Sequence, residues 1–188
     1  MKLLTTGLAA LILTISMAAP ALSAEEAGVT LQDSQFVGTR IVALNGIALR
    51  EKFFVDVYVA GLYLTEKSSD TATILSKDTA RLMVMHFVHD VEAGKINEAW
   101  FEGLEDNIDP VTPELTAKFE QLAAMMDDIK DGEAMSFAYA PGTGTTVMVR
   151  GMNKGTIPGK DFADAILATW IGPKPGPGKS FKKALLGQ

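Results

Sequence analysis

The sequence predicts an α+β domain, in which a large antiparallel sheet carries a layer of helices against one face. Two long segments, residues 53–64 and 81–89, alternate between inward and outward positions as strands do. Two later segments, residues 91–107 and 112–126, repeat apolar residues at helical spacing, and strand patterns return after them. Strands, two helices, strands again and a further helix together favour one α+β domain.

The N-terminal residues have the order of a secretory signal peptide. Lys2 supplies a positive charge, residues 3–19 carry no charge, and Pro20 is followed by small residues at the positions that a signal peptidase reads. We therefore expect residues 1–23 to be cleaved off after Ser23, with cleavage after Ala24 as the alternative.

The rival interpretation of this segment is an uncleaved membrane anchor. Its apolar run of about 17 residues is at the lower limit for spanning a bilayer, and Glu25-Glu26 directly after it suits export better. We expect a mature periplasmic domain over residues 24–188, of the bacterial type, with no stable membrane insertion after cleavage.

The composition excludes several classes of protein. The chain has 23 acidic and 17 basic residues, a formal net charge of −6, so it repels phosphate backbones and nucleic-acid binding is not expected. It has no cysteine, which excludes disulfides, thiolate metal sites, Fe–S clusters and a cysteine nucleophile. With 47% hydrophobic and 21% charged residues, it has the composition of a globular domain.

The first half of the mature chain is predicted to form strands. Residues 36–44 mix β-branched and polar side chains, and Asn45-Gly46 after them predicts a tight turn. The odd positions of residues 53–64 form one apolar face, and the even positions are more mixed. Both faces of residues 81–89 are largely apolar, as in a central strand.

Helices are predicted next. Residues 91–107 have Asp90 as a candidate N-cap. Thr112 and Pro113 open a second helix as cap and first residue. Its expected buried stripe is Leu115, Phe119, Leu122 and Met126.

The last third returns to strands before ending in helices. Residues 134–140 and 145–150 flank a hairpin turn, and a helix is expected over residues 159–171. The Gly/Pro-rich residues 172–178 cannot continue that helix and predict an extended connector to a terminal helix over residues 179–186.

No metal or cofactor site is predicted. His86 and His89, the two histidines, lie three residues apart on a predicted strand and would point to opposite faces. Gly142-Thr143-Gly144-Thr145 lacks the Lys-Ser/Thr of a phosphate loop and is better explained as a hairpin turn. The nine methionines lie within apolar patterns and are interpreted as core residues.

Several separated motifs resemble those of chalcone isomerase-like proteins, and most closely the exported bacterial branch of that family. They cover the mature domain in order: residues 44–46 with 50–64, then 141–145, 155–159 and 168–172. The resemblance implies an open-faced β-sandwich, with a large antiparallel sheet, a layer of helices and a ligand cleft between them.

The resemblance also implies a partner for the cleft. Fatty-acid-binding members hold the carboxylate with an arginine and a tyrosine thirteen residues later, here Arg50 and Tyr63. A guanidinium can donate two charge-assisted hydrogen bonds to a carboxylate, and a phenol can add a third. Side chains an odd number apart on a strand point to opposite faces, so this pairing requires a turn or bulge near Glu51-Lys52.

An intramolecular lyase or isomerase of the chalcone isomerase type is the alternative function. By register, Lys95 and Thr169 match its helix lysine and late threonine, and Tyr58 stands in place of its strand threonine. Glu92 and Ala99 replace a tyrosine and an asparagine, which removes donors that would stabilise an oxyanion.

The sequence therefore favours a non-catalytic, exported protein that binds a small apolar carboxylate such as a fatty acid. A third possibility is an envelope interaction protein whose cleft is vestigial and filled by side chains.

Overall fold

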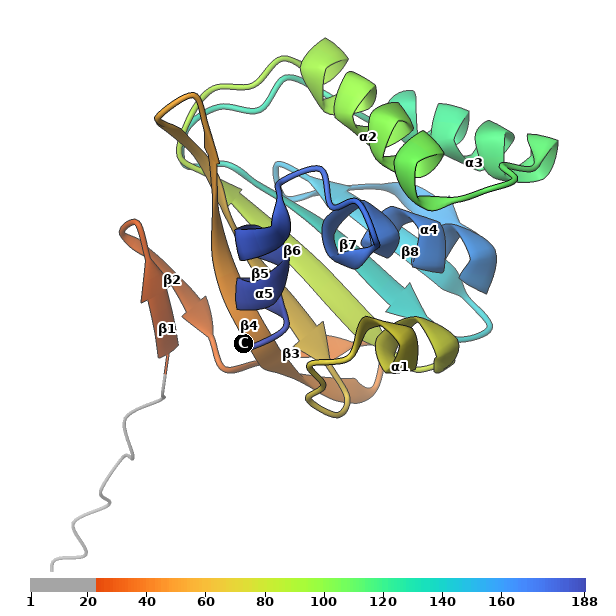
Figure 1. Ribbon diagram of the computed structural model, residues 1–188, viewed down its shortest axis with the longest axis horizontal. Coiled ribbons are helices and arrows are strands. Elements are labelled where there is room, and N and C mark those ends of the chain that lie inside the picture. Colours follow the sequence, from red (N-terminus) through yellow and green to blue (C-terminus); the bar gives the residue numbers. More distant parts are fainter. Residues whose placement is uncertain (1–22) are drawn as a thin grey trace, which may run out of the picture.

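The computed structural model describes residues 23–188, so the predicted signal peptide lies, apart from Ser23, outside the described residues. Figure 1 shows one curled sheet with helices across one of its faces. This is the predicted α+β architecture, an open-faced sandwich of a large antiparallel sheet and a helical layer.

Seven strands form the main sheet, each antiparallel to its neighbours, and their spatial order follows their order in the chain. They are β3 (Ser34–Val37), β4 (Arg40–Lys52), β5 (Val55–Leu64), β6 (Arg81–Phe87), β7 (Ala134–Ala140), β8 (Gly144–Val149) and β9 (Met152–Ile157). A separate hairpin, which the sequence did not predict, is formed by β1 (Ser23–Glu26) and β2 (Val29–Gln32).

The expected turn at Asn45-Gly46 is wrong, because β4 runs straight through these residues. Their place in the ladder is a bulge, since Leu44 pairs with Tyr63 and Gly46 with Leu62. The Asn45 side chain donates to the carbonyl oxygens of Ser68 and Leu185 and accepts from the Ser68 amide. The dipeptide therefore fastens the C-terminal helix to the sheet. The turn before β4 falls between Val37 and Arg40 instead.

The described residues contain five helices, and only the first of them was not predicted. They are α1 (Thr71–Ser76), α2 (Ala93–Asn107), α3 (Pro113–Ala123), α4 (Lys160–Ile171) and α5 (Lys179–Leu185). The cap at Thr112 is confirmed, because its hydroxyl accepts from the Leu115 amide. For α2 the N-cap is Glu92, not Asp90, whose carboxylate accepts from the Asp131 amide.

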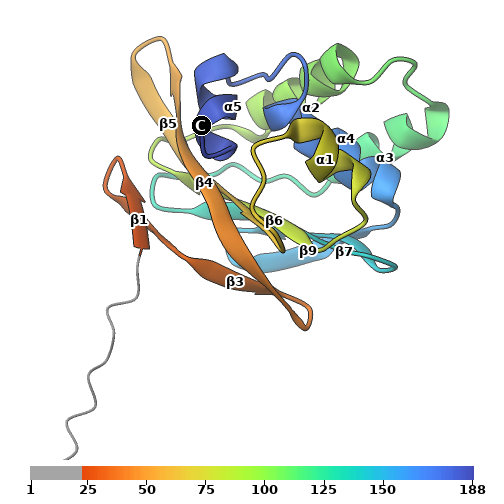
Figure 2. The same ribbon diagram turned by 60° about the horizontal axis from the view of Figure 1, so that its bottom comes forward.

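Two hydrophobic clusters hold the layers together, one on each face of the sheet. The larger lies between the sheet and the helices and contains the predicted stripe of α3. The smaller packs the β1–β2 hairpin, through Leu31, on the opposite face of β4 and β5. On β5, Tyr58 belongs to the first cluster and Tyr63 to the second. Figure 2 shows the hairpin and the helices on opposite sides of the curled sheet.

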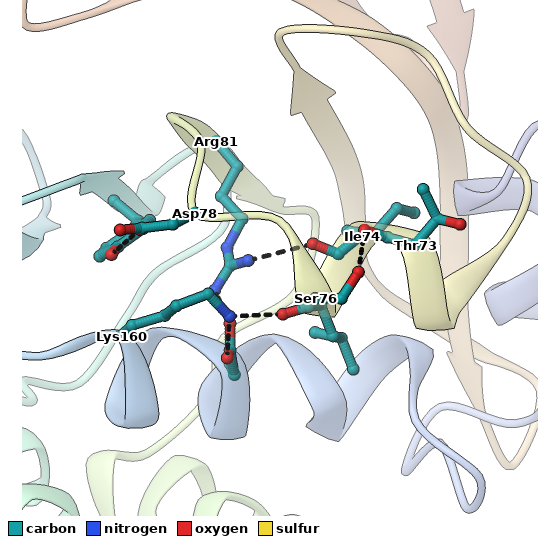
Figure 3. A network of polar contacts seen from close by, with 9 residues as sticks. Thr73, Ile74, Ser76, Asp78, Arg81 and Lys160 are labelled. Carbon is teal, nitrogen blue, oxygen red and sulfur yellow. Dashed lines mark hydrogen bonds and ion pairs between the residues drawn. The ribbon is translucent and has the colours of Figure 1, made fainter.

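A polar network fixes α1 to the rest of the fold, away from the cleft described below. The Arg81 side chain from β6 donates to the carbonyl oxygen of Ile74, and the Lys160 ammonium from α4 donates to that of Leu75. Both cations also contact the Asp164 carboxylate. Figure 3 shows them approaching the last turn of α1, where cations stabilise the unpaired carbonyl groups of a helix.

Candidate ligand-binding cleft

A cleft of about 820 Å³ lies between the sheet and the helices. One wall is the free end of the β4–β5 hairpin with the C-terminal end of β6, and the other is α2. The end of α4 and the connector of residues 173–179 complete it. Three stretches of the chain, residues 50–58, 85–106 and 169–179, therefore build one site.

Arg50 lies near the end of β4 and lines this cleft. Its Nη1 donates to the carbonyl oxygen of Pro177 at 2.9 Å, which ties it to the connector. Among residues 23–188 no carboxylate lies within ion-pair distance of the guanidinium. A guanidinium has five N–H donors, so most of the donors of Arg50 remain available to a ligand.

Tyr58 is the cross-strand partner of Arg50 and lines the same cleft. A bulge at Val57 brings the two together, since Arg50 pairs with Tyr58 but Glu51 pairs with Asp56. Burial raises the pKa of the Tyr58 phenol to about 12, although the Trp170 hydrogen bond and nearby Arg50 oppose this. The phenol therefore stays protonated at physiological pH.

The Tyr58 hydroxyl is an acceptor in the structure and a potential donor to a ligand. The indole Nε1 of Trp170 donates to it at 3.3 Å, and within residues 23–188 its own proton has no acceptor. The cleft thus presents a cationic fork and a neutral phenol side by side, a combination suited to a carboxylate.

Aromatic and aliphatic side chains form the inner wall of the cleft. Trp100 from α2 and Trp170 from α4 pack edge to face at 5.3 Å between ring centroids, and Phe87 and Met85 lie on β6 beneath them. The buried Nε1 of Trp100 has no hydrogen-bond partner among the described residues. Both tryptophans of the chain line the cleft, so their fluorescence can report on its contents.

The predicted convergence of Arg50 and Tyr63 is wrong in geometry. Tyr63 is fully buried on the opposite face of the sheet, in the cluster with Leu31, and does not line the cleft. Its hydroxyl donates to the carbonyl oxygen of Gln32 in β2 at 2.9 Å. A bulge does exist, but it lies at Val57 on β5 and pairs Arg50 with Tyr58. Tyr63 is five residues further along the same strand and therefore points to the opposite face.

Lys95 and Thr169, carried over as possible catalytic or cleft residues, both line the cleft. The Lys95 ammonium is exposed at the rim and pairs with Glu98 at 2.8 Å, which raises the pKa of Lys95. The Thr169 hydroxyl is buried and donates to the carbonyl oxygen of Ile166. Gly103 allows α2 to approach it, because a Cβ there would lie 2.8 Å from the Thr169 side chain.

Charge at the rim is opposite in sign to that of the whole chain. The lining residues include five cations, Arg50, Lys52, Lys95, Lys174 and Lys179, but only two carboxylates, Glu102 and Asp106. The whole chain has a formal net charge of −6. The cleft mouth therefore attracts anions. No cluster of three metal-ligating side chains occurs in the part of the chain that the structure describes.

Sequence reasoning missed two parts of the site. Trp170 falls within the motif of residues 168–172 but is not among the predicted site residues, although its indole donates to the Tyr58 hydroxyl. The carbonyl of Pro177 could not be foreseen as the partner of Arg50, because the two are 127 residues apart. The predicted extended connector leaves backbone carbonyls without helical or sheet partners, which is the one signal that the sequence offered.

The fold and the cleft define a class of protein: an open-faced α+β sandwich with an apolar, cation-rimmed cleft between sheet and helices. The chain belongs to the chalcone isomerase-like family, whose profile matches residues 23–187. A solved structure with this fold is that of a fatty-acid binding protein from Arabidopsis thaliana, with a TM-score of 0.70 and 15% identity. The match covers 88% of this chain and 96% of that chain. Curated protein sequences give no match.

Proposed function

We propose that this protein binds a small, mostly apolar carboxylate, such as a fatty acid, in the cleft between sheet and helices. The observation that carries the proposal is the Arg50 guanidinium, which lines an apolar cleft without an acidic partner among residues 23–188. Membership of the chalcone isomerase-like family and the fold shared with a fatty-acid binding protein support it.

Arg50 and Tyr58 are the proposed head-group ligands. The guanidinium supplies two parallel donors and Tyr58 a third, while the Pro177 carbonyl holds Arg50 in place. Tyr58 thus takes the role that the resemblance assigned to Tyr63, because only Tyr58 shares the cleft with Arg50.

The proposed tail site lies among the aromatic residues. Trp100, Trp170, Phe87 and Met85 present apolar surface behind the head group. A cleft of about 820 Å³ falls within the range of roughly 300–1,000 Å³ that small-molecule sites have. Such a volume also argues against a vestigial cleft filled by side chains.

The alternative function is an isomerase that would use Arg50 as electrophile with Lys95 and Thr169 nearby. The observation in its favour is that all three line one cleft. Against it, the Thr169 hydroxyl donates its hydrogen bond to the Ile166 carbonyl oxygen, and Lys95 forms an ion pair with Glu98 at the exposed rim. Its test is an absorbance assay with chalcone-type substrates, in which turnover lost in Lys95→Met would favour catalysis.

Extraction and titration test the binding proposal. Purified protein is extracted with organic solvent, bound lipids are identified by mass spectrometry, and the stripped protein is titrated with palmitate by tryptophan fluorescence. We expect Arg50→Gln to weaken palmitate binding by about tenfold to a hundredfold, the loss of a charge-assisted contact. Arg40→Gln, at the exposed far end of the same strand, is the matched control and should bind as the wild type does. Empty extracts together with equal affinities for the two variants would reject the proposal.

We also propose that the protein is exported to the periplasm after cleavage following Ser23 or Ala24. Support comes from the order of charge, apolar run and small residues at the N-terminus. Intact-mass analysis of protein from a periplasmic fraction tests it. A mass that includes residues 1–22 would contradict cleavage.

A further inference from the structure

The turn of the β4–β5 hairpin carries two aromatic residues whose side chains are exposed to solvent. Phe53 and Phe54 join Lys52 to Val55, and their exposed fractions are 86% and 102%. Val55 beside them is 40% exposed. These three residues form the hairpin-tip patch, which lies at the periphery of the molecule (Figure 2).

The backbone of this turn is unfavourable for the residues that it carries. Both Phe53 and Phe54 have positive φ, 51° and 66°, as in a type I′ turn. Asn-Gly is the preferred pair there, since a Cβ in the left-handed region clashes with the backbone. The two phenylalanines are therefore unfavourable for this turn, and their side chains bury almost no surface in the core. Exposed aromatic residues on a strained turn are the kind of feature that marks a contact site for another surface.

The patch adjoins the mouth of the cleft and its cations. Phe53, Val55 and Lys52 line the cleft, as does Lys179 across it. Within residues 23–188, neither Lys52 nor Lys179 forms an ion pair. Glu51 and Asp56 flank the turn as an opposing cross-strand pair. Exposed aromatics with unpaired cations beside them, here Lys52 and Lys179, are elements that place a protein on an anionic lipid surface.

We propose that the hairpin-tip patch docks the cleft mouth on an anionic lipid surface. Phe53 and Phe54 enter the boundary between head groups and acyl chains, and Lys52 and Lys179 contact lipid phosphates. The cleft then opens toward the bilayer, so an apolar carboxylate passes between membrane and cleft with little exposure to water. This use of the docked state rests on the proposed function, whereas docking itself does not.

Vesicle binding by the delipidated protein tests the proposal. Vesicles of phosphatidylglycerol and phosphatidylcholine in equal parts are sedimented with wild type, with the double variant Phe53→Asn/Phe54→Gly and with Phe36→Thr. The double variant installs the preferred I′ pair and should fold at least as well. Phe36, on β3, is 73% exposed and pairs with Ile41 on β4, so it is the matched aromatic control.

We expect the double variant to partition onto the vesicles at least about tenfold less than wild type, because it no longer buries two aromatic rings. Phe36→Thr should partition as wild type does. For wild type, binding should fall when phosphatidylglycerol is omitted or salt is raised.

A wild type that does not sediment with anionic vesicles, or a double variant that binds as well as wild type, would overturn the proposal. Equal losses in both variants would also overturn it, since they would indicate non-specific adhesion. Palmitate titration in the absence of vesicles reports separately on the proposed function.

Discussion

Arg50 and Tyr58 show how one inserted residue decides which side chains meet. On a regular ladder the faces of β5 would alternate without interruption, but the bulge at Val57 lets Tyr58 pair with Arg50 while Glu51 pairs with Asp56. Tyr63 follows the regular alternation from Tyr58 and so faces the β1–β2 hairpin. The head-group site therefore depends on a local irregularity of the strand.

Removal of the Tyr58 hydroxyl should weaken the binding of a carboxylate but not of its ester. We expect Tyr58→Phe to lower palmitate affinity by about tenfold or more, the loss of one hydrogen bond to a charged group, and to change methyl palmitate affinity little. Tyr63→Phe is the matched control, since its hydroxyl contacts Gln32 on the other face. It should cost about 0.5–1.5 kcal/mol in the free energy of unfolding and leave palmitate binding unchanged. An effect of Tyr63→Phe on affinity equal to that of Tyr58→Phe would contradict this assignment.

The raised pKa of Tyr58 predicts a loss of stability at alkaline pH. Between pH 10 and 12 the unfolded chain has released this phenolic proton, whereas the native state still holds it, because burial raises the pKa to about 12. The native state then binds more protons, so the free energy of unfolding falls as pH rises, by about 1.4 kcal/mol per pH unit for this group. Urea denaturation from pH 9 to pH 12 measures it, and Tyr58→Phe should have a shallower slope. Parallel slopes for the two proteins would contradict the prediction.

At the scale of elements, Asn45-Gly46 joins the C-terminal helix to the sheet. Asn45 bonds the end of α5 and the loop after β5. Gly46 lets the α5 backbone approach, since a Cβ there would lie 2.1 Å from the Ala184 carbonyl oxygen. Phe181 of α5 packs edge to face against the Tyr58 ring, with 5.9 Å between the ring centroids. Because Tyr58 lines the cleft, the junction between α5 and the sheet also supports the cleft.

A methyl group at Gly46 should displace α5. We expect Gly46→Ala to lower the free energy of unfolding by about 2–3 kcal/mol, because the atoms in its way are backbone and cannot rotate aside. Gly94→Ala on α2 is the control, with nothing within 4 Å of its added Cβ, and should be neutral or stabilising by up to about 1 kcal/mol. Urea denaturation compares them. Equal stabilities would show that α5 does not need this close approach.

The sequence predicted the elements whose apolar residues repeat at strand or helix spacing, and it missed those that contacts with distant residues stabilise. The strands β5 and β6 and the N-cap of α3 depend on neighbouring residues, and they form where they were expected. Phe53 is a correction, because it lies in the hairpin turn and not on the apolar face of β5. Asn45-Gly46 has the local signal of a turn, but it lies within β4, where the Asn45 side chain bonds Leu185 and Ser68. The six residues of α1 are too few for a helical period, and contacts from β6 and α4 hold them.

At the scale of the whole molecule, the site was only partly predictable for the same reason. Arg50 was singled out by the resemblance to chalcone isomerase-like proteins, and it does line the cleft, whereas its part in ligand binding stays a prediction. Tyr58 was expected in the cleft as well, but its pairing with Arg50 depends on a bulge, and the contacts made by Trp170 and Pro177 span more than a hundred residues. No pattern along the chain encodes these.

A ligand in this cleft should stabilise the whole fold, because the cleft walls come from the sheet, α2, α4 and the connector. At a hundredfold excess over Kd, a ligand that binds only the native state adds about 2.7 kcal/mol to the free energy of unfolding. For a domain of this size we expect palmitate to raise Tm by about 5–10 °C.

Amide hydrogen exchange should slow together in the end of the β4–β5 hairpin, in α2 and in residues 172–178, but not in β3, which lies at the edge of the sheet. At the same palmitate concentration Arg50→Gln should lose half of the Tm shift or more, since a tenfold weaker Kd leaves about 1.4 kcal/mol, and Arg40→Gln should keep the full shift. Protection confined to one wall, or an undiminished Tm shift in Arg50→Gln, would place the ligand elsewhere.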